Sequence, residues 1–290
     1  MNEIFRILSW NISWGAMTAN ETSKNDISAK YLAYYKCYNF GNVPNPSCKD
    51  NVINYLKKLN SSFHFIGLQE AAKWNDIYKE LKNKYAIIHS RSGIANLVTL
   101  YRNNIYKYKD HINDFIHTSG RPYHIILFKH ILTNNNYIII NLHNGHNTTK
   151  NELEITLSKG IDKIKSININ KHYRTIIFGD FNDHGNYNYW KGFYPFKYSK
   201  FKNLQNIKVK CKYKPPNTCC IGKSFLRTNI NQDLYYGDYI LVDNNFTVKL
   251  KLPNPKIFNY NAHIYPTSDH LPIIGKIFNY NAHIYPIYKR

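Results

Sequence analysis

Acidic, amide and imidazole side chains follow directly after short apolar runs in this sequence, and these groups can bind metals and move protons. The clearest example is TIIFGDFND at residues 175–183, where β-branched and aromatic residues precede Asp180, Asn182 and Asp183. Such a run predicts a buried strand, and polar groups at the end of a strand are held rigidly. The same three residues also suit a plain turn, because Asp, Asn and Gly favour turns. This segment alone leaves both interpretations open.

Further residues of these kinds stand at the ends of other apolar runs: Asn11, Glu70, His143, Asp238, Asp269 and His270. Each one alone has a structural explanation, as a cap, a turn residue or a histidine at the edge of a core. Ligands of open α/β sheets bind outside the carboxyl ends of the strands. We therefore expect these side chains, together with Asp180 and Asn182, to converge on one site.

The oxygen-bearing members of this set suit a hard divalent cation. Glu70 and Asp269 offer carboxylates, and Asn11 offers a neutral amide oxygen. Mg²⁺ takes one or two carboxylates and keeps several waters for a substrate phosphate, and Mn²⁺ accepts the same ligands. The pattern therefore predicts a Mg²⁺ site, with Mn²⁺ as the alternative.

The remaining members suit the hydrolysis of a phosphoester by water. His143 and His270 would hydrogen-bond the non-bridging oxygens or move protons, and Asp238 would orient His270. Asp180 would orient or deprotonate the attacking water, and Asn182 would hold that water in line with the phosphate. No serine or cysteine nucleophile is needed in this scheme.

Hydrophobic patterning predicts the strands and helices that would position these groups. Strands are expected at residues 5–12, 63–68, 85–89, 95–101, 124–131, 136–142, 175–180, 239–242 and 271–277. Helices are expected at residues 47–59, with Ser47 as the N-cap, at 74–81 and at 150–167. This arrangement of strands and helices indicates the α/β class.

An internal repeat lies near the C-terminal end. The segment KIFNYNAHIYP occurs identically at residues 256–266 and 276–286. We interpret the repeat as a local duplication, because a single repeat of this size does not form a solenoid. We expect one domain over residues 1–278, followed by a tail at 279–290 that carries the duplicated segment; an added edge strand is the alternative for that tail.

The chain is strongly basic. It has 290 residues, with 39 Lys and Arg against 18 Asp and Glu, and a formal net charge of +21. Such a charge favours polyanions such as nucleic acid, phosphorylated molecules or an anionic surface. An AT-rich genome would also place many lysines on a tolerant surface, so the charge supports polyanion binding without requiring it.

Cysteine usage and the N-terminal residues bear on location. The five cysteines, an odd number, predict reduced thiols in an intracellular compartment. The opening residues MNEIFRIL carry no secretory signal, and no stretch approaches the roughly 18–20 apolar residues of a membrane helix. We therefore expect an intracellular protein, cytoplasmic or nuclear, without stable membrane insertion. A zinc site at Cys211, Cys219 and Cys220 is disfavoured, because the spacing of these cysteines matches no zinc finger or zinc ribbon.

Taken in order, the polar clusters resemble a known family. The ordered set is SWN (9–11), LQE (68–70), NLHNGHN (141–147), GDFND (179–183), GDYILV (237–242) and SDH (268–270). Over residues 4–278 the chain resembles the endonuclease/exonuclease/phosphatase superfamily with its DNase I-like fold. The resemblance implies an α/β (α+β) four-layer sandwich, in which two mixed β-sheets pack face to face and helices lie on both outer faces.

The resemblance also implies a role for each matching residue. It implies metal ligation by Asn11, Glu70 and Asp269, a phosphate-side role for His143, catalytic Asp180 and Asn182, and a His270–Asp238 pair. Arg121, in the segment Gly120-Arg121-Pro122, is either structural or directed at phosphate. The segment 184–232 interleaves aromatic residues with lysines, so it would either stack on bases or pack as a loop on the sandwich.

We expect a Mg²⁺-dependent phosphodiesterase that acts on DNA or RNA, as an endonuclease or exonuclease. The alternative with the same fold is a phosphatase or phosphodiesterase for a phosphorylated lipid or another small phosphoester. A third hypothesis, a binding module on a retired catalytic fold, is disfavoured because every catalytic position holds a competent residue. We expect a monomer without an obligate protein partner.

Overall fold

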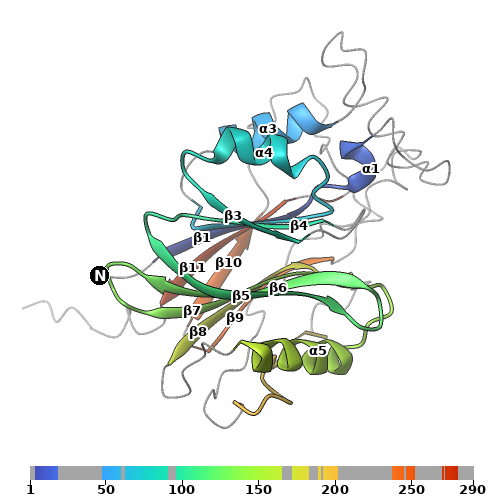
Figure 1. The fold of residues 1–290 in the computed structure, drawn as a ribbon, viewed down its shortest axis with the longest axis vertical. Helices are drawn as coiled ribbons and strands as arrows, with labels where there is room; N and C mark the ends of the chain where they lie inside the picture. Colours follow the sequence, from blue (N-terminus) through green and yellow to red (C-terminus); the bar gives the residue numbers. More distant parts are fainter. Residues whose placement is uncertain are drawn as a thin grey trace, which may run out of the picture.

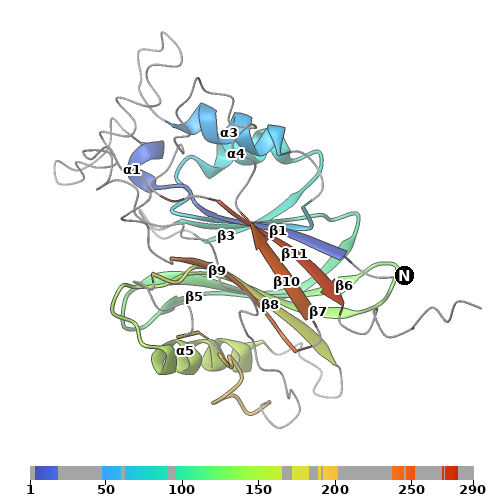
Figure 2. The ribbon, with the colours of Figure 1, turned by 180° about the vertical axis from the view of Figure 1, so that it is seen from behind.

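Two β-sheets pack face to face, and helices cover their outer faces. The computed structural model describes residues 4–18, 48–59, 63–90, 96–164, 172–182, 189–190, 192–201, 237–244, 246–251, 270 and 272–279. In Figure 1 the helices α3 and α4 lie above the upper sheet and α5 lies below the lower one. The view from behind shows the same four layers (Figure 2). The expected four-layer α/β sandwich is thus confirmed.

The six-stranded sheet has the order β10-β11-β1-β2-β4-β3. Its strands are β1 (Ile4–Asn11), β2 (Phe65–Gln69), β3 (Ala86–Ser90), β4 (Leu97–Tyr101), β10 (Phe246–Lys251) and β11 (Ile273–Asn279). β1 and β2 are parallel, and the other pairs of neighbours are antiparallel. The parallel pair places Asn11 and Gln69 side by side at its carboxyl end.

The five-stranded sheet has the order β5-β6-β7-β8-β9. Its strands are β5 (Tyr106–Ile116), β6 (Arg121–His130), β7 (Asn136–His143), β8 (Tyr173–Asp180) and β9 (Asp238–Val242). This sheet also contains one parallel pair, β7 and β8, in which His143 lies opposite Asp180. Both sheets are therefore mixed, as expected.

The described helices are α1 (Trp14–Met17), α3 (Lys49–Lys58), α4 (Trp74–Leu81) and α5 (Lys150–Lys163). α5 begins at a capping box in which Thr149 and Glu152 satisfy each other's backbone N–H groups, and it buries Leu153, Leu157 and Ile161 against the five-stranded sheet. The N-cap of α3 is Cys48 and not the expected Ser47, and no side chain caps that end. None of the helices in the described ranges has the length and apolar character needed to cross a membrane.

The layer between the sheets is apolar and aromatic over most of its extent. Its buried residues are Phe5, Ile7, Phe65, Tyr106, Ile126, Phe128, Tyr137, Ile139, Ile176, Phe178, Ile240, Val242, Phe246, Val248, Ile273 and Ile277, with Ile88 and Tyr101 at its margin. The sheets approach most closely at Gly67, where a Cβ atom would lie 2.3 Å from the Phe178 ring. Only glycine allows that approach.

Two strands lack the apolar run by which a strand is predicted from the sequence. β5 is an edge strand whose side chains are mostly exposed, and β10, also at an edge, alternates buried Phe246 and Val248 with more exposed polar residues. Edge strands are half solvated, so their composition is polar. β11 contains the first residues of the second repeat copy, Lys276 to Asn279. The rest of that copy and the whole first copy lie outside the described residues, so the domain limits stay a prediction.

Cys48 is disulfide-bonded. The expectation of reduced thiols is therefore wrong for this cysteine, and the cysteine count gives no support to an intracellular location. The other four cysteines, and the disfavoured zinc site among them, lie outside the described residues.

Candidate active site

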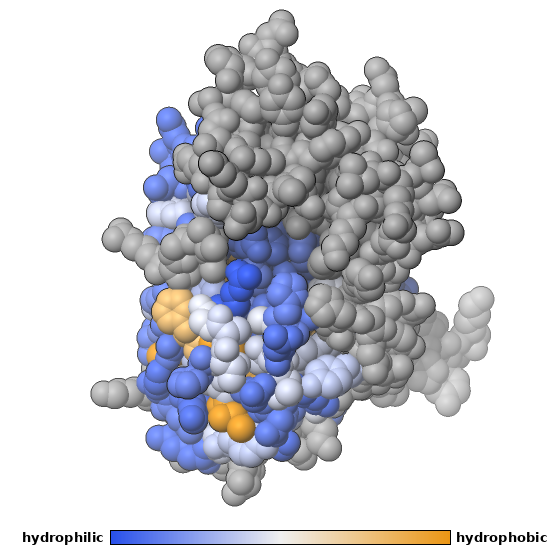
Figure 3. Space-filling view, turned by 90° about the vertical axis from the view of Figure 1, so that its right-hand side faces the viewer, coloured by the Kyte–Doolittle hydropathy of each residue, from blue (hydrophilic) through white to orange (hydrophobic). Residues whose placement is uncertain are grey.

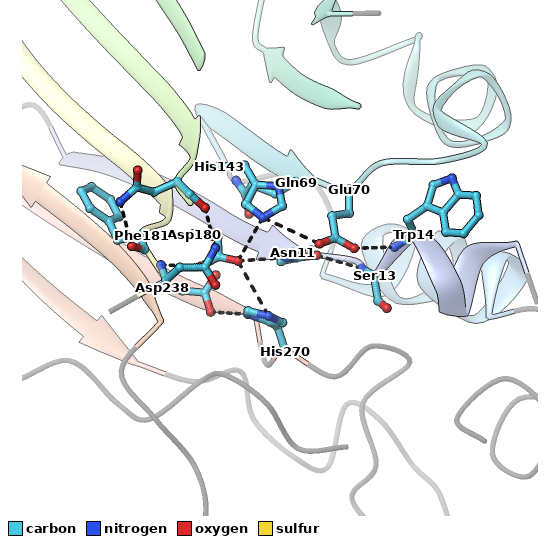
Figure 4. Close-up of polar contacts among 12 residues, drawn as sticks. Asn11, Ser13, Trp14, Gln69, Glu70, His143, Asp180, Phe181, Asp238 and His270 are labelled. Atoms are coloured by element: carbon cyan, nitrogen blue, oxygen red, sulfur yellow. Dashed lines mark hydrogen bonds and ion pairs between the residues drawn. The ribbon is translucent and has the colours of Figure 1, made fainter. Parts of the chain in front are cut away.

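The polar residues at the strand ends converge at one edge of the sandwich, next to α1 (Figure 4). Asn11 and Glu70 come from the carboxyl ends of β1 and β2 in the six-stranded sheet. His143 and Asp180 come from the carboxyl ends of β7 and β8 in the five-stranded sheet. β9 runs antiparallel to β8, so its first residue, Asp238, pairs with Asp180. The site therefore joins the two sheets.

Asp180 lies at the centre of this group and is almost completely buried. Its Oδ2 atom accepts a hydrogen bond from Asn11 Nδ2 at 3.0 Å. The same oxygen lies 3.6 Å from His143 Nε2 and 3.7 Å from His270 Nε2. One carboxylate oxygen thus faces an amide from one sheet and two imidazoles.

Glu70 lies at the tip of β2, partly exposed. Its Oε2 atom accepts a hydrogen bond from the backbone N–H of Trp14 at 2.9 Å. Its Oε1 atom lies 3.4 Å from Asn11 Nδ2 and 3.7 Å from His143 Nε2. The start of α1 therefore holds one oxygen of Glu70, and the other faces Asn11 and His143.

Asn182 is held through both its backbone and its side chain. Its N–H donates to Asp180 Oδ1 at 2.9 Å, and its side-chain Nδ2 donates to the carbonyl of Asn144 at 2.6 Å. Asn144 in turn donates its N–H to the carbonyl of Asp180 at 2.7 Å and its Nδ2 to the carbonyl of Phe181 at 3.1 Å. Asn144 was not among the expected site residues, although it lies in the NLHNGHN segment. Its role depends on backbone contacts between two loops, which no residue pattern indicates.

His270 and Asp238 form a buried pair. His270 Nδ1 lies 2.9 Å from Asp238 Oδ2, so Nδ1 carries the hydrogen and donates it to the carboxylate. The carbonyl of His270 accepts a hydrogen bond from the indole Nε1 of Trp10 at 3.0 Å. These contacts orient the ring so that Nε2 faces Asp180. Asp269, expected as a metal ligand, lies outside the described residues.

His143 is buried, and burial lowers the pKa of its imidazole to about 3. The Asp180 carboxylate acts in the opposite direction and raises this pKa, and the positive charge of Arg121 lowers it further. The ring is therefore neutral near pH 7, and its contacts with Glu70 and Asp180 are not ion pairs even though a charged ring would make them so. Arg121 lies at the start of β6, half-buried, close enough for its charge to act on the ring.

The backbone at this edge is strained. Ser13, Glu70 and Asn182 are non-glycine residues with φ angles of 57°, 53° and 49°. Left-handed backbone in such residues costs on the order of 1 kcal/mol or more and clusters at functional sites. Each of the three binds another site residue: Ser13 donates its N–H to Asn11 Oδ1 at 3.0 Å, Glu70 accepts from Trp14, and Asn182 donates to Asp180. These three strained residues therefore take part in the hydrogen bonds that position the site.

The donor set fits a hard divalent cation. Glu70 Oε1 and Asp180 Oδ2 both face the Asn11 amide, and the ion pairs of these two carboxylates within the described residues involve histidine and no Lys or Arg. Excess negative charge on converging oxygens is the environment that Mg²⁺ selects. Asn11 turns its nitrogen, and not its oxygen, toward these carboxylates, so its role as a ligand stays a prediction.

A second grouping is also compact enough for a metal. Ligand atoms of Asp180, Asp238 and His270 all lie within 4.8 Å of one another. The hydrogen bond between Asp238 and His270 already occupies the facing atoms of these two residues. That contact favours an oriented histidine over a metal ligand, so the Glu70–Asp180 oxygens are the better candidates.

Comparison with known sequences gives a family match over most of the chain. The sequence profile of the Endonuclease/Exonuclease/phosphatase family matches residues 8–270. A curated relative, the Uncharacterized protein L684 of Acanthamoeba polyphaga mimivirus, is 30% identical over 146 residues, which cover 47% of this chain. The chain spans only 28% of the length of that relative.

Solved structures share the fold at low sequence identity. The endonuclease/exonuclease/phosphatase from Bacteroides vulgatus is 18% identical with a TM-score of 0.61, covering 95% of this chain and 98% of its own. The mannosyl-6-phosphatase Bt3783 of Bacteroides thetaiotaomicron is 16% identical with a TM-score of 0.60, covering 94% and 99%. The TDP2 of D. rerio, complexed with single-strand DNA product, is 14% identical with a TM-score of 0.51, covering 95% and 99%.

The family match includes every described strand except β11 and the first half of β1, and the described residues of the site from Asn11 to His270. The chain therefore belongs to the endonuclease/exonuclease/phosphatase family, whose members hydrolyse phosphoesters, as its polar clusters indicated.

Proposed function

We propose that this protein is a divalent-metal-dependent phosphodiesterase that hydrolyses nucleic acid by in-line attack of water. The observation that carries the proposal is the convergence on Asp180 Oδ2 of an amide and two imidazoles, with the Glu70 carboxylate beside them. A carboxylate, oriented histidines and a hard-oxygen set are the groups that hydrolysis of a phosphodiester needs.

Asp180 and Asn182 are proposed to position the attacking water. Asp180 Oδ2 is the proposed acceptor for a water proton, because it is the oxygen that faces both imidazoles, whereas Oδ1 accepts the Asn182 N–H. The Nδ2 atom of Asn182 is engaged by the Asn144 carbonyl, so its amide oxygen is the atom offered to the water. Holding the water in line with the phosphorus removes much of the entropic barrier to attack.

His270 and His143 are proposed to act on the phosphate oxygens. Asp238 holds His270 in one tautomer and orientation, with Nε2 toward the reacting group. The neutral His143 ring offers Nε2–H as a donor without adding a charge. Donors fixed in advance, in a buried site, stabilise developing charge better than mobile water does. Arg121, near His143, is proposed to face the phosphate as well.

Glu70, with Asn11 and Asp269, is the proposed metal-binding set, and Asp180 lies next to it. When bound, Mg²⁺ or Mn²⁺ would neutralise charge on the phosphate. The chain's own contribution is to hold the Glu70 oxygens apart, one on the Trp14 N–H and one toward Asn11 and His143. This arrangement keeps one oxygen free of backbone contacts.

Charge and surface support nucleic acid as the substrate. The net charge of +21 favours a polyanion. Seen from the side where α1 lies, the described surface is mostly hydrophilic, with only scattered apolar residues (Figure 3). A lipid substrate would call for an apolar lip at the site. The fold is also that of a TDP2 whose solved structure contains a single-strand DNA product.

The test is a panel of substrates with purified protein. Labelled duplex DNA, single-stranded DNA, abasic-site DNA and RNA are incubated with Mg²⁺, with Mn²⁺ and with EDTA. We expect cleavage of at least one nucleic acid with either metal, none with EDTA, and loss of cleavage in Asp180→Asn. The control is Asp114→Asn, which removes only a surface ion pair with Lys163. Failure to cleave any nucleic acid by metal-loaded protein would overturn the proposal.

The same panel contains the alternative function. A mannosyl-6-phosphatase has this fold, and the site groups suit a phosphomonoester equally well. Para-nitrophenyl phosphate, mannose 6-phosphate and a phosphoinositide in vesicles are therefore included. Turnover of one of these without nucleic-acid cleavage, and insensitive to competitor DNA, would assign the alternative. We also propose a monomer without an obligate partner, which light scattering measures directly.

A further inference from the structure

The active site is divided between the two sheets. Asn11 and Glu70 belong to the six-stranded sheet, and His143, Asp180 and Asp238 belong to the five-stranded sheet. Any slide of one sheet over the other changes the distance between Glu70 and Asp180. Apolar contacts between sheets are non-directional and hold such a position loosely. A directional contact between the sheets is therefore needed near the site.

Gln69 and Asn141 make that contact. Gln69, which directly precedes Glu70, donates its Nε2 to Asn141 Oδ1 at 2.9 Å across the two sheets. Asn141 lies two residues before His143 on β7. Both side chains are fully buried. The hydrogen bond thus joins the strand end that carries Glu70 to the strand end that carries His143.

Asn141 also binds a second strand of the opposite sheet. Its Nδ2 donates to the carbonyl of Val98 at 2.8 Å and to Thr99 Oγ1 at 3.0 Å, both on β4. Gln69 Nε2 lies 3.4 Å from Ser9 Oγ on β1. The Asn141 amide of the five-stranded sheet is therefore bonded to two strands of the other sheet, β2 and β4, and its position is fixed in more than one direction.

The pair is not optimal for stability. Gln69 Oε1 is buried and accepts no hydrogen bond in the described part of the chain. A buried acceptor without a donor costs about 1–3 kcal/mol, and an apolar pair of the same shape would avoid that cost. Over most of the inter-sheet layer the two sheets meet through apolar side chains, which carry no such cost. The polar pair therefore has a reason other than stability.

We propose that Gln69 and Asn141 are positioning residues for catalysis, an inter-sheet hydrogen bond that sets where Glu70 stands relative to His143 and Asp180. The inference rests on the proposed function, since it concerns the efficiency of the same site. Its competitor is a purely structural role, in which the pair only satisfies two buried amides.

A double substitution separates the two roles. Gln69→Met takes the donor from Asn141 Oδ1, and Asn141→Leu takes a partner from Gln69 Nε2, the Val98 carbonyl and Thr99 Oγ1, so each should lower the midpoint of urea unfolding. The double variant also takes the Asn141 donor from the Val98 carbonyl and Thr99 Oγ1, but it no longer buries an unpaired Gln69 amide. We expect the double variant to unfold at or above the midpoint of Asn141→Leu alone, while kcat stays about 10–100-fold low with KM little changed, because small misplacements have effects of this size.

A matched control lies at the other end of β8 and β9. Asp243 is buried and its Oδ2 accepts the backbone N–H of Thr175 at 2.7 Å, far from the site edge. Asp243→Leu removes this buried acceptor, so it should lower the unfolding midpoint as the single variants do, and leave kcat of the folded protein unchanged. A double variant with wild-type kcat, or a control with the same loss of kcat, would overturn the positioning role.

The ring signals of His143 in an NMR spectrum give a readout that does not need activity. We expect the double variant to shift these signals and Asp243→Leu to leave them in place. If wild-type protein cleaves nothing, the proposed function fails, and the His143 shift still decides whether the pair positions the site. Unshifted signals in the double variant would overturn the inference in either case.

Discussion

The two ends of the inter-sheet layer differ in chemistry. At the end away from the site the sheets meet through rings: Phe65 lies 4.6 Å from Tyr106 and 5.3 Å from Phe128, centroid to centroid, and Phe5 lies 5.2 Å from Tyr137. At the site end the sheets meet through the buried polar side chains of Ser9, Gln69, Thr99, His124 and Asn141. Buried aromatic surface holds the sheets together at one end, and directional hydrogen bonds hold them together at the other.

The difference separates stability from position. Aromatic packing gives large free energies that depend weakly on exact placement, whereas hydrogen bonds give small net free energies that depend strongly on geometry. Substitutions at the ring end should therefore change the free energy of unfolding, and those at the polar end should change the rate of the reaction. The predictions below test that division from the largest expected effect to the smallest.

The largest effect is expected at Asp180. Asp180→Asn keeps the shape and one acceptor oxygen for the two N–H donors from Asn11 and Asn182, but it removes the proposed base that faces the water. We expect kcat to fall by up to about 10⁴-fold, the range of a lost general base, with nearly unchanged thermal unfolding. Steady-state kinetics and a melting curve on the same sample measure both. A variant that unfolds early would show that Asp180 is structural.

The next largest effect is expected at Phe65, at the ring end. Phe65→Ala removes a fully buried ring that contacts Tyr106 and Phe128, and it should lower the free energy of unfolding by about 3–5 kcal/mol. In urea titration, Phe115→Ala serves as control, since Phe115 is 44% exposed and should change little. Activity per folded molecule should stay at the wild-type level. A selective loss of kcat would contradict the division.

A smaller effect is expected at Gly67, where the two ends of the layer meet. Gly67→Ala would place a Cβ atom 2.3 Å from the Phe178 ring and force the sheets apart. Overpacking of this kind costs about 1–3 kcal/mol. Gly67 lies two residues before Gln69 and Phe178 lies two residues before Asp180, so a displacement of the sheets at this contact should lower kcat as well. Adding Phe178→Leu makes room for the methyl group, and it should restore both quantities in part; no recovery would show that the contact with Phe178 is not the cause.

The smallest effect is expected from pH acting on His124 at the polar end. Burial lowers the pKa of His124 to about 3, and its Nδ1 lies 3.0 Å from Thr99 Oγ1. Below about pH 6.5 His124 is protonated in the unfolded chain but stays neutral in the folded protein. The free energy of unfolding therefore decreases as the pH falls toward 3. The slope for one such group approaches about 1.4 kcal/mol per pH unit.

Urea titrations between pH 7 and pH 5 measure this slope. His124→Gln should reduce this slope by the contribution of one titrating group. The contributions of His64 and His143, whose pKa values burial also lowers, should stay unchanged. An unchanged slope in His124→Gln would mean that the ring is protonated inside the fold.

The strand ends of the site could be predicted from the sequence because each follows a buried apolar run, as β7 and β8 do with YIIINLH and TIIFGD. β5 could not, because an edge strand carries mixed polar residues. The Gln69–Asn141 contact could not either, since its partners lie 72 residues apart and in different sheets. The positive φ angles of Ser13, Glu70 and Asn182 were equally hidden, because tertiary contacts impose them on residues with ordinary propensities.

The order of the strands also bears on when the enzyme becomes active during its synthesis. The chain starts in the six-stranded sheet with β1, builds the five-stranded sheet, and returns so that β11 pairs with β1. A nascent chain that has emerged through β9 already contains Glu70, His143, Asp180 and Asp238. It lacks both His270 and β11, the strand that pairs antiparallel with β1. Because β11 and His270 follow β9 in the sequence, the six-stranded sheet and the His270–Asp238 pair form only after all the strands of the five-stranded sheet have been synthesised, so the proposed site is the last part of the described fold to be assembled.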